Sequence, residues 1–592
     1  MSISANNAKE ALSPSEPQDT AVGVGEQVVG IPLQRGAAVD LIAITLLWCL
    51  AVLIVNPVGN FPLNDDWAMG QTVKQLVEKG QYQPSGWTSM PMISQVFWGA
   101  LFCLPKGFSF TALRCSTLVM SLLGVLGIYA LIRQLGRSRV LSVIGALALG
   151  FNPIYFALSN TFMTDVPFAA LAAWSSWFFV RHLQRESLAD LLLATALATA
   201  AALCRQLALC LPLAFGAALL LRRGCHQGSL LRGLLPFVVV GAALAALKHW
   251  LTITGKLPAQ YDLSTGKLLL VLKHPLRIPL NVVYYGWSMM MYLGLFLLPV
   301  TLPAVFNTGY RSRCAQRIMA VRITLGLFFL ATVVRLIIVP SLMPVHYNII
   351  IPQGIGPAIL HDSNVKSLPN LPPLPSFFWL VVTGLSLFGA ALLAVYLVMS
   401  VLELSSRFRQ TRGTADDSVR HFFLFAVVLY LAPLLLSGFF DRYLIPAVVF
   451  GLGLVVLARG ELAWPNGRGQ YLAAILLVSG FAIFGVTGTR DYLEWNRVRW
   501  RALDELLAQK DITPGKVDGG FEFNGYYKYD TFTKTNWWLV DDSYAITFGE
   551  MKGFTPLQQY RYRNWLPPRE GRILALKRTG PAQPKTTVVP ER

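Results

Sequence analysis

Long apolar runs recur along most of this chain, and they limit what it can fold into more than any other feature. A helix rises 1.5 Å per residue, so about 20 apolar residues cross the roughly 30 Å hydrocarbon core of a bilayer. About thirteen runs approach or exceed this length. They lie near residues 38–58, 109–132, 139–158, 166–180, 188–203, 206–221, 233–251, 280–305, 319–343, 376–401, 422–438, 443–458 and 470–487. Because backbone polar groups must be bonded internally inside a membrane, we expect a polytopic all-α bundle.

The composition agrees with an integral membrane protein. Of 592 residues, 54% are hydrophobic and only 14% are charged, and the mean hydropathy is +0.50. A net charge of +19 would suggest nucleic-acid binding in a soluble chain, but here the arginines concentrate in short connections between apolar runs. We therefore expect no nucleic-acid partner. The seven cysteines are scattered without a C-x-x-C pair, which argues against a disulfide framework or a zinc site.

The arginine-rich connections alternate with arginine-poor ones, and this alternation predicts the topology. By the positive-inside rule the arginine-rich set is cytoplasmic, as is the N-terminus. An odd number of spans then places the C-terminus outside. We expect a disordered cytoplasmic tail over residues 1–36, a transmembrane domain over 37–488 and an external α+β domain over 489–592. In that last domain the pattern predicts a helix over 491–509 and strands over 515–520, 537–544 and 572–577.

The first external loop, residues 59–107, is too long for a simple connection. Apolar residues at helical spacing over 67–79 and 95–104 predict two helices, either lying at the membrane surface or packed as ordinary amphipathic core helices. Near the start of this loop stand Asp65 and Asp66. Paired acids beside a span face water or a wet cavity and suit general-base chemistry. The same residues before Trp67 also suit a helix N-cap.

Further candidate residues fall in turns on the same predicted face. Asp165 begins a run after Thr164, where an acid suits either a functional site or a helix cap. Arginines at membrane-surface turns suit phosphate binding, and snorkelling to lipid headgroups or a local ion pair with Asp441 are the alternatives. The candidate phosphate-binding residues are Arg205, Gln206, Arg442 and Tyr443.

These motifs resemble those of a known group. Asp65-Asp66 in a long first loop, the turn around Asp165, Arg205-Gln206 and the Arg442-Tyr443 stretch look like polytopic glycosyltransferases of the GT-C fold. The branch is similar to glycosyltransferase family 39, the protein O-mannosyltransferase and aminoarabinose transferase group. The resemblance covers about residues 38–460, and it departs from the group in having Asp66 where Glu is frequent.

The resemblance implies an activity and roles for these residues. The donor would be a sugar linked to polyprenyl phosphate, and a glycan, lipid or protein acceptor would receive it with inversion on the external face. Asp65 would be the general base, Asp66 and Asp165 would orient it or place the acceptor, and Arg205 and Arg442 would neutralise the leaving phosphate. Members of the group differ in whether a metal is needed, so no cofactor is assigned and the sequence leaves a divalent cation open. The setting implied is a bacterial inner membrane with a periplasmic site, and the alternative is a transporter or flippase for a polar or anionic solute or a lipid-linked sugar.

Overall fold

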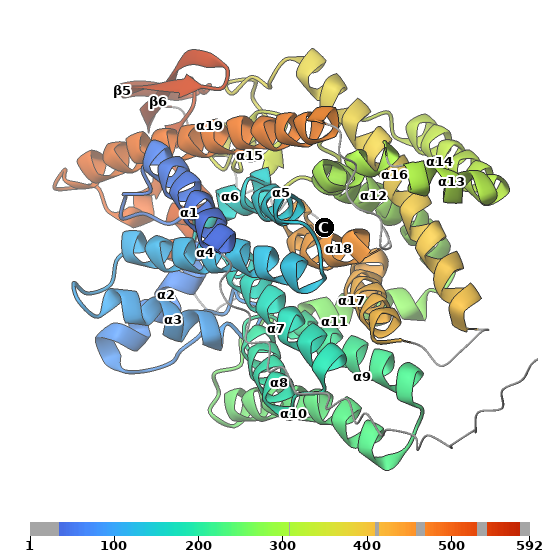
Figure 1. The fold of residues 1–592 in the computed structure, drawn as a ribbon. Coiled ribbons are helices and arrows are strands. Elements are labelled where there is room, and N and C mark those ends of the chain that lie inside the picture. Colours follow the sequence, from blue (N-terminus) through green and yellow to red (C-terminus); the bar gives the residue numbers. More distant parts are fainter. Residues whose placement is uncertain (1–34, 307, 409–413, 458–467, 530–540, 580–592) are drawn as a thin grey trace, which may run out of the picture.

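Helices make up most of the molecule, and many are long enough to cross a membrane (Figure 1). The computed structural model describes residues 35–306, 308–408, 414–457, 468–529 and 541–579. Nine helical segments in these ranges pass a length and hydropathy test for spanning, or ten if one bent pair counts as a span. The helices concerned are α1 (Arg35–Val55), α4 (Phe110–Gln134), η1 (Gln206–Leu209) with α9 (Cys210–Arg223), α10 (Gln227–Ile253), α12 (Arg277–Val305), α14 (Ile318–Ile338), α16 (Ser376–Phe408), α17 (Ala415–Ser437) and α19 (Arg468–Leu507).

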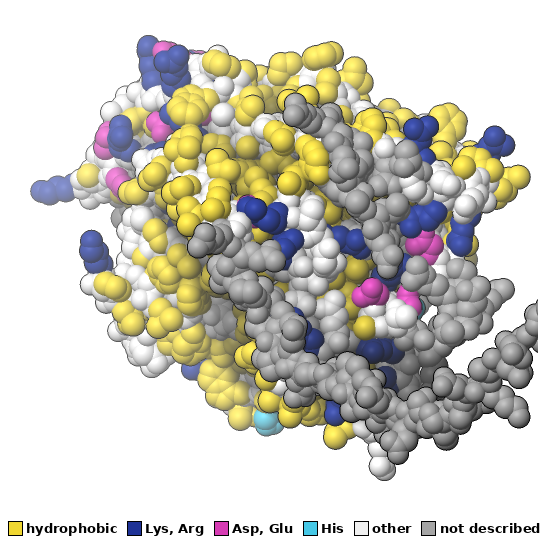
Figure 2. Space-filling view, in the orientation of Figure 1, with side chains coloured by type: hydrophobic (Ala, Val, Ile, Leu, Met, Phe, Trp, Pro, Cys, Tyr) yellow, Lys and Arg dark blue, Asp and Glu magenta, His cyan; other side chains and the backbone are white. Residues whose placement is uncertain are grey.

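Each of the thirteen apolar runs coincides with a helix or with the bent pair, which confirms the all-α polytopic architecture. The three remaining runs form α7 (Asp165–Arg185), α8 (Leu188–Ala202) and α18 (Ile445–Leu457), which do not pass the spanning test. Helix α18 is buried along its whole length and packs against α7, α12 and α17. The number of thirteen spans stays a prediction. Figure 2 shows broad hydrophobic patches with few Asp or Glu side chains on the visible face.

The bent pair consists of α5 (Arg139–Gly150) and α6 (Pro153–Ser159), which meet at 62°. Pro153 at the start of α6 cannot donate a backbone hydrogen bond to α5, so the helix breaks there. The side chain of Asn152 caps α6 by accepting from Ile154 N at 3.0 Å and Tyr155 N at 3.2 Å. The break leads through the short α6 into the turn that carries Asp165.

Residues 59–107 form the two predicted helices, α2 (Asp66–Lys79) and α3 (Ile93–Cys103). Helix α2 ends at Gly80, whose left-handed φ of 65° closes the helix. It buries Trp67, Met69 and Val73 and packs against α3 and the later α20 (Phe521–Lys528). The helices are confirmed, whereas their place at the membrane surface stays a prediction.

The other connections contain short elements. They are α11 (Leu263–Lys273), α13 (Thr308–Gln316), the antiparallel strands β1 (Ile350–Ile351) and β2 (Gly354–Ile355), α15 (His361–Asn364) and η2 (Asp441–Leu444). The loop over 344–375, which holds β1, β2 and α15, contacts both the membrane helices and the C-terminal domain. It therefore links the two parts of the chain.

The C-terminal domain is α+β, as predicted, and it begins without a break. Helix α19 runs through the expected boundary at 489 and is followed by η3 (Pro514–Lys516) and a four-stranded sheet in the order β3-β4-β6-β5. The strands are β3 (Val517–Asp518), β4 (Tyr544–Thr547), β5 (Phe554–Trp565) and β6 (Pro568–Arg578). Strands β5 and β6 form a long antiparallel hairpin that packs on α19.

The local predictions for this domain have mixed outcomes. The helix over 491–509 and the strand over 572–577 are confirmed within α19 and β6. The strand over 515–520 was too long, because Pro514 starts a 3-10 turn and only two residues pair with β4. Half of the strand over 537–544 lies outside the described residues, and in the other half only Tyr544 belongs to a strand, β4. The tail over 1–36 also lies outside them, except for residues 35 and 36, which belong to α1. Strand β5 was not predicted.

Buried carboxylates fix the C-terminal domain in place. Asp491 of α19 accepts hydrogen bonds from Trp565 N at 2.9 Å and Leu566 N at 2.8 Å. Nδ1 of His361 lies 2.7 Å from Oδ2 of the buried Asp518. Burial alone would raise the pKa of Asp518, but the hydrogen bond from His361 holds that pKa below its usual range. The contacts of Asp491 hold the hairpin on α19, and the contact of His361 with Asp518 keeps the domain against the 344–375 loop.

Candidate active site

Four turns from distant parts of the chain meet and bring together the predicted charged residues. Asp65 immediately precedes α2, and Asp165 opens α7. Arg205 precedes η1, and Arg442 lies in η2, which joins α17 to α18. Because each side chain stands at a helix end, the packing of the helices determines where its charge lies.

Asp65 is engaged by two side chains. Its Oδ1 accepts a hydrogen bond from Nε1 of Trp87 at 3.0 Å, and its Oδ2 accepts from Nη2 of Arg442 at 2.8 Å. The side chain of Asp65 is 19% exposed and that of Arg442 is 6% exposed. Asp65 occupies the N-cap position of α2 but makes no side-chain cap hydrogen bond. The carboxylate therefore faces a cation rather than the helix end.

A second ion pair joins Asp165 and Arg205. Nη1 of Arg205 donates to Oδ1 of Asp165, and both side chains are buried. Oδ2 of Asp165 is buried and has no hydrogen-bond partner among the described residues. The preceding Thr164 makes no side-chain cap bond, so the geometry does not favour the capping interpretation of this turn.

Tyr443 links the two pairs. Its ring centroid lies 4.8 Å from Cζ of Arg205 and 5.5 Å from Cζ of Arg442. Burial alone would lower the pKa of Arg442, but the charge of Asp65 holds it above its usual range. Burial alone would also lower the pKa of Arg205, but the charge of Asp165 raises it. The result is one cluster of two carboxylates and two guanidinium groups, in which both guanidinium groups keep their charge in spite of burial.

Asp66 has different surroundings from Asp65. Its Oδ1 accepts from Leu63 N at 2.5 Å and its Oδ2 from Phe162 N at 3.0 Å. The residue is 1% exposed, and burial raises its pKa to about 7 although the two backbone hydrogen bonds oppose this. Asp66 thus ties the Asp65 loop to the turn that carries Asp165.

Two other predicted residues also make supporting contacts. Nε2 of Gln206 donates to the carbonyl of Ser89 at 3.3 Å, within the 59–107 loop. The carbonyl of Tyr443 accepts from the hydroxyl of Tyr430 at 2.8 Å. These contacts fix both turns, and the ring of Tyr443 remains against the arginines.

Asp441 does not pair with the guanidinium of its neighbour, which was the alternative for this turn. Its carboxylate accepts from the backbone N–H groups of Ile349 at 3.0 Å, Ile350 at 2.8 Å and Arg442 at 2.7 Å. This arrangement shapes η2 and leaves the guanidinium of Arg442 directed at Asp65.

Residues of the C-terminal domain reach this site, which the sequence did not reveal. Oε1 of Glu522 accepts from the backbone N–H of Asn64 at 2.8 Å, next to Asp65. Asn64 has a left-handed φ of 57°, a conformation that needs support from its surroundings in a residue other than glycine. Oε2 of Glu522 accepts from Nη1 of Arg499 at 2.9 Å, and both side chains are 0% exposed. The segment 518–525 is recognisable in the sequence by its glycines and acids, but its sequence does not predict which residues it contacts.

Arg114 is a second residue that sequence reasoning missed. It lies inside the apolar run of α4, and its guanidinium donates to the carbonyls of Pro57 at 2.5 Å, Gly59 at 3.1 Å and Phe61 at 3.0 Å. A lone charge within an apolar run is a usable signal, because such a residue needs internal partners. Here it holds the chain between α1 and Asp65.

The divalent cation that the sequence leaves open has no evident ligand set among the described residues. Within the described ranges, no group of three or more His, Cys, Asp or Glu side chains is placed to hold a metal ion. The involvement of a cation therefore stays a prediction.

Comparison with known proteins supports the resemblance seen in the sequence. Residues 90–252 match the family model described as dolichyl-phosphate-mannose-protein mannosyltransferase. This match confirms the predicted resemblance to GT-C, family 39-like membrane glycosyltransferases, and its range includes Asp165 and Arg205. The comparison with curated proteins finds no match.

Three solved structures show more distant similarity. The oligosaccharyltransferase of Archaeoglobus fulgidus in the apo form is 13% identical, with a TM-score of 0.40 over 80% of this chain and 60% of that one. ArnT from Cupriavidus metallidurans bound to undecaprenyl phosphate is 13% identical, with a TM-score of 0.37 over 91% of this chain and 98% of that one. The arabinosyltransferase EmbB from Mycobacterium smegmatis is 15% identical, with a TM-score of 0.29 over 78% and 42%. Because all three TM-scores lie below 0.5, no structural conclusion rests on them.

Proposed function

We propose that this protein, which matches the mannosyltransferase family model over residues 90–252, transfers a sugar from a polyprenyl-phosphate-linked donor to an acceptor hydroxyl. The reaction takes place on the external face of the membrane, the periplasmic face of a bacterial inner membrane, and inverts the anomeric centre. The observation that carries the proposal is the meeting of Asp65, Asp165, Arg205 and Arg442 in one cluster around Tyr443.

Asp65 is the general base in this proposal. It removes the proton of the acceptor hydroxyl as the acceptor oxygen attacks the anomeric carbon. The bond between that carbon and the phosphate oxygen breaks, and the polyprenyl phosphate leaves with the bonding electrons. A base at the attacking hydroxyl and positive charge at the departing phosphate oxygen suit this displacement.

Arg442 has donors left for the leaving phosphate. Only its Nη2 binds Asp65, while its buried Nε has no hydrogen-bond partner in the described part of the chain. Its Nη1 has a long contact, 4.0 Å, to Sδ of Met163. An arginine binds phosphate through two donors at once, so Arg442 can hold a phosphate oxygen without first releasing Asp65.

The transporter alternative has less support. Secondary transporters place ionisable groups on broken helices near the middle of the membrane. One bent helix pair, α5 with α6, exists in the described chain, but neither helix carries a residue of the cluster. We therefore retain the enzyme as the proposal.

The test is Asp65→Asn in proteoliposomes supplied with a panel of polyprenyl-phosphate sugars and membrane extract as acceptor. General-base catalysis contributes about 10²- to 10⁴-fold, so the release of polyprenyl phosphate should fall by that factor. Asp262→Asn is the matched control, because Asp262 is 57% exposed in an ion pair with Lys248. Wild-type release from a folded Asp65→Asn variant would remove Asp65 as the base.

A further inference from the structure

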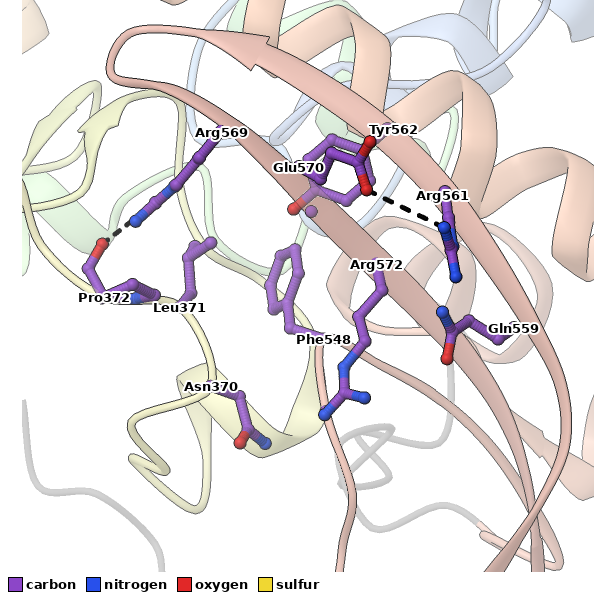
Figure 3. Close-up of a pocket in the computed structure, with 12 residues that line it drawn as sticks. Asn370, Leu371, Pro372, Phe548, Gln559, Arg561, Tyr562, Arg569, Glu570 and Arg572 are labelled. Carbon is purple, nitrogen blue, oxygen red and sulfur yellow. Dashed lines mark hydrogen bonds and ion pairs between the residues drawn. The ribbon is translucent and has the colours of Figure 1, made fainter.

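A cavity of about 390 Å³ opens in the C-terminal domain, where the β5–β6 hairpin meets residues 370–372 of the 344–375 loop (Figure 3). Its volume lies in the range of roughly 300–1,000 Å³ that is typical of small-molecule sites. None of its lining residues belongs to the candidate active site. We call it the hairpin cavity.

Positive charge predominates in the hairpin cavity. Three arginines, Arg561, Arg569 and Arg572, line it together with a single acid, Glu570. Arg561 and Arg572 are direct partners across the hairpin, and like charges in that position repel each other. The ion pair of Arg561 with Glu570 is long, at 3.9 Å, and 74% exposed on both sides, so it offsets little of this repulsion. An anion between the two guanidinium groups would remove the repulsion.

Arg572 and Arg569 differ in how much of their hydrogen-bonding capacity is used. Nη2 of Arg569 donates to the carbonyl of Pro372 at 3.2 Å, which anchors it at the rim of the cavity. Arg572 makes no hydrogen bond or ion pair with the described residues, and in Figure 3 it extends toward Asn370. The guanidinium of Arg572 is thus a donor of the cavity that is not used by the described residues.

The remaining walls suit a sugar ring. Phe548 and Tyr562 are 3% and 6% exposed, so their rings close the base of the cavity without offering a free face, and the amides of Asn370 and Gln559 supply polar contacts. Side-chain amides both donate and accept hydrogen bonds and therefore bind the hydroxyl groups of a sugar. A cavity that combines these amides with the guanidinium of Arg572 fits a sugar that carries an acidic group.

Hydrogen bonds to a buried carboxylate hold one wall of the cavity in place. Nδ2 of Asn370 donates to Oδ2 of Asp362 at 2.8 Å, and the same oxygen accepts from Phe548 N at 3.0 Å and Gly549 N at 3.1 Å. A Cβ at Gly549 would lie 2.5 Å from the amide carbon of Asn370, and a Cβ at Gly571 would overlap the ring of Tyr562. Both positions therefore require glycine for these side chains to lie where they do.

We propose that the hairpin cavity binds an acidic sugar unit, bearing a carboxylate or a phosphate, of the acceptor. That this sugar unit belongs to the acceptor rests on the proposed function, whereas the binding of an acidic sugar does not. The 344–375 loop connects the two sites: Oδ1 of Asn348 accepts from Nδ2 of Asn64 at 3.1 Å beside Asp65, and Asn370 of the same loop lines the cavity. Binding in the cavity would hold the acceptor on the loop that reaches the base.

The experiment measures binding to the full chain in phosphatidylcholine nanodiscs by titration calorimetry. The probes are glucose 6-phosphate, glucuronate, glucose and inorganic phosphate. We expect the two acidic sugars to bind about tenfold or more tightly than either glucose or phosphate alone, because each charge-assisted hydrogen bond adds to the contacts of the ring. Arg572→Gln should weaken acidic-sugar binding by about the same factor. Arg563 lies on the same hairpin but outside the cavity, so Arg563→Gln should change the affinity for the acidic sugars by no more than about twofold.

Several outcomes would overturn the inference. Equal binding of glucose and glucose 6-phosphate would exclude recognition of the acidic group, and equal binding of inorganic phosphate would exclude recognition of the sugar. Loss of acidic-sugar binding in phosphatidylglycerol nanodiscs would identify the ligand as a lipid headgroup. If the acidic sugars bind but no sugar transfer is found with any donor, the proposed function fails while the cavity assignment stands.

Discussion

Two buried arginine–carboxylate pairs lie on either side of Asn64, and they differ in how completely their hydrogen bonds are satisfied. In the pair of Arg499 with Glu522, Nε and Nη2 of the arginine donate to the carbonyl of Gly519 at 2.9 and 2.7 Å, and both side chains are 0% exposed. In the pair of Arg442 with Asp65, Nε of the arginine has no partner in the described chain, and the carboxylate is 19% exposed.

This difference in hydrogen bonding indicates that one pair has a structural role and the other a role in the reaction. A fully bonded buried pair has no capacity for a ligand and mainly fixes the geometry around it. A pair with free donors and a partly exposed carboxylate can still bind phosphate and accept a proton. We therefore expect the first pair to govern stability and the second to govern activity, and four experiments test this contrast.

The largest effect on stability is expected for Glu522→Gln. The variant keeps an acceptor for Asn64 but leaves the buried charge of Arg499 unpaired, which costs about 3–5 kcal/mol. Chemical denaturation of the purified protein in detergent measures this loss. Asp65→Asn is the matched variant and should cost about 1 kcal/mol, since Asp65 is partly exposed and Arg442 still lies near the charge of Asp165. Equal losses in the two variants would remove the distinction between the pairs.

Arg442→Ala is expected to act mainly on the reaction. Removing one donor to a developing negative charge lowers turnover by about 10²- to 10³-fold. Arg442→Lys should recover part of the rate, because a lysine supplies charge without the planar fork. The measurement is kcat and KM for the polyprenyl-phosphate donor in proteoliposomes. Unchanged donor kinetics in the alanine variant would refute the phosphate-binding role.

Asp66→Asn should have an intermediate effect on stability. An asparagine offers one acceptor oxygen where Leu63 N and Phe162 N now bind two, so one buried N–H loses its partner at a cost of about 1–3 kcal/mol. Protease sensitivity of the 59–107 loop measures the loosening. A variant as resistant as the wild type would show that Asp66 does not hold this loop.

The smallest effect is expected at the link between His361 and Asp518. Burial alone would lower the pKa of His361, but the hydrogen bond to Asp518 raises it, while the pKa of Asp518 is lowered. The stabilisation by His361 is present below its unfolded pKa of about 6.5 and is lost as pH rises through the folded value. The stabilisation by Asp518 is present above its unfolded pKa of about 3.8 and is lost as pH falls through its lowered folded pKa.

The link is therefore strongest between about pH 4 and 6.5. Thermal unfolding of the wild type and of His361→Gln from pH 4 to 9 should show their difference, about 1 kcal/mol, shrinking above neutral pH. A difference independent of pH would show that the contact is not an ion pair.

Much of the fold was predictable because its signals are local. Helices in a membrane must be apolar over a whole span, so each run from 38–58 to 470–487 coincides with a helix or, at 139–158, with a bent pair of helices. Strand β5 was missed because its exposed residues, such as Gln558 and Arg561, show little apolar alternation. The length of β3 was overestimated because only two residues of it find a partner strand.

The sequence by itself determined the helices and the candidate charges, since hydropathy and residue type are properties of short segments. Only the tertiary structure decided the partners: Arg442 and Asp65 are 377 residues apart, and Glu522 and Asn64 are 458 apart. It also separated two adjacent acids, directing Asp65 to a guanidinium and Asp66 to backbone N–H groups. The physical reason is that an ion pair forms wherever packing brings opposite charges together, and no local pattern encodes a contact between distant turns.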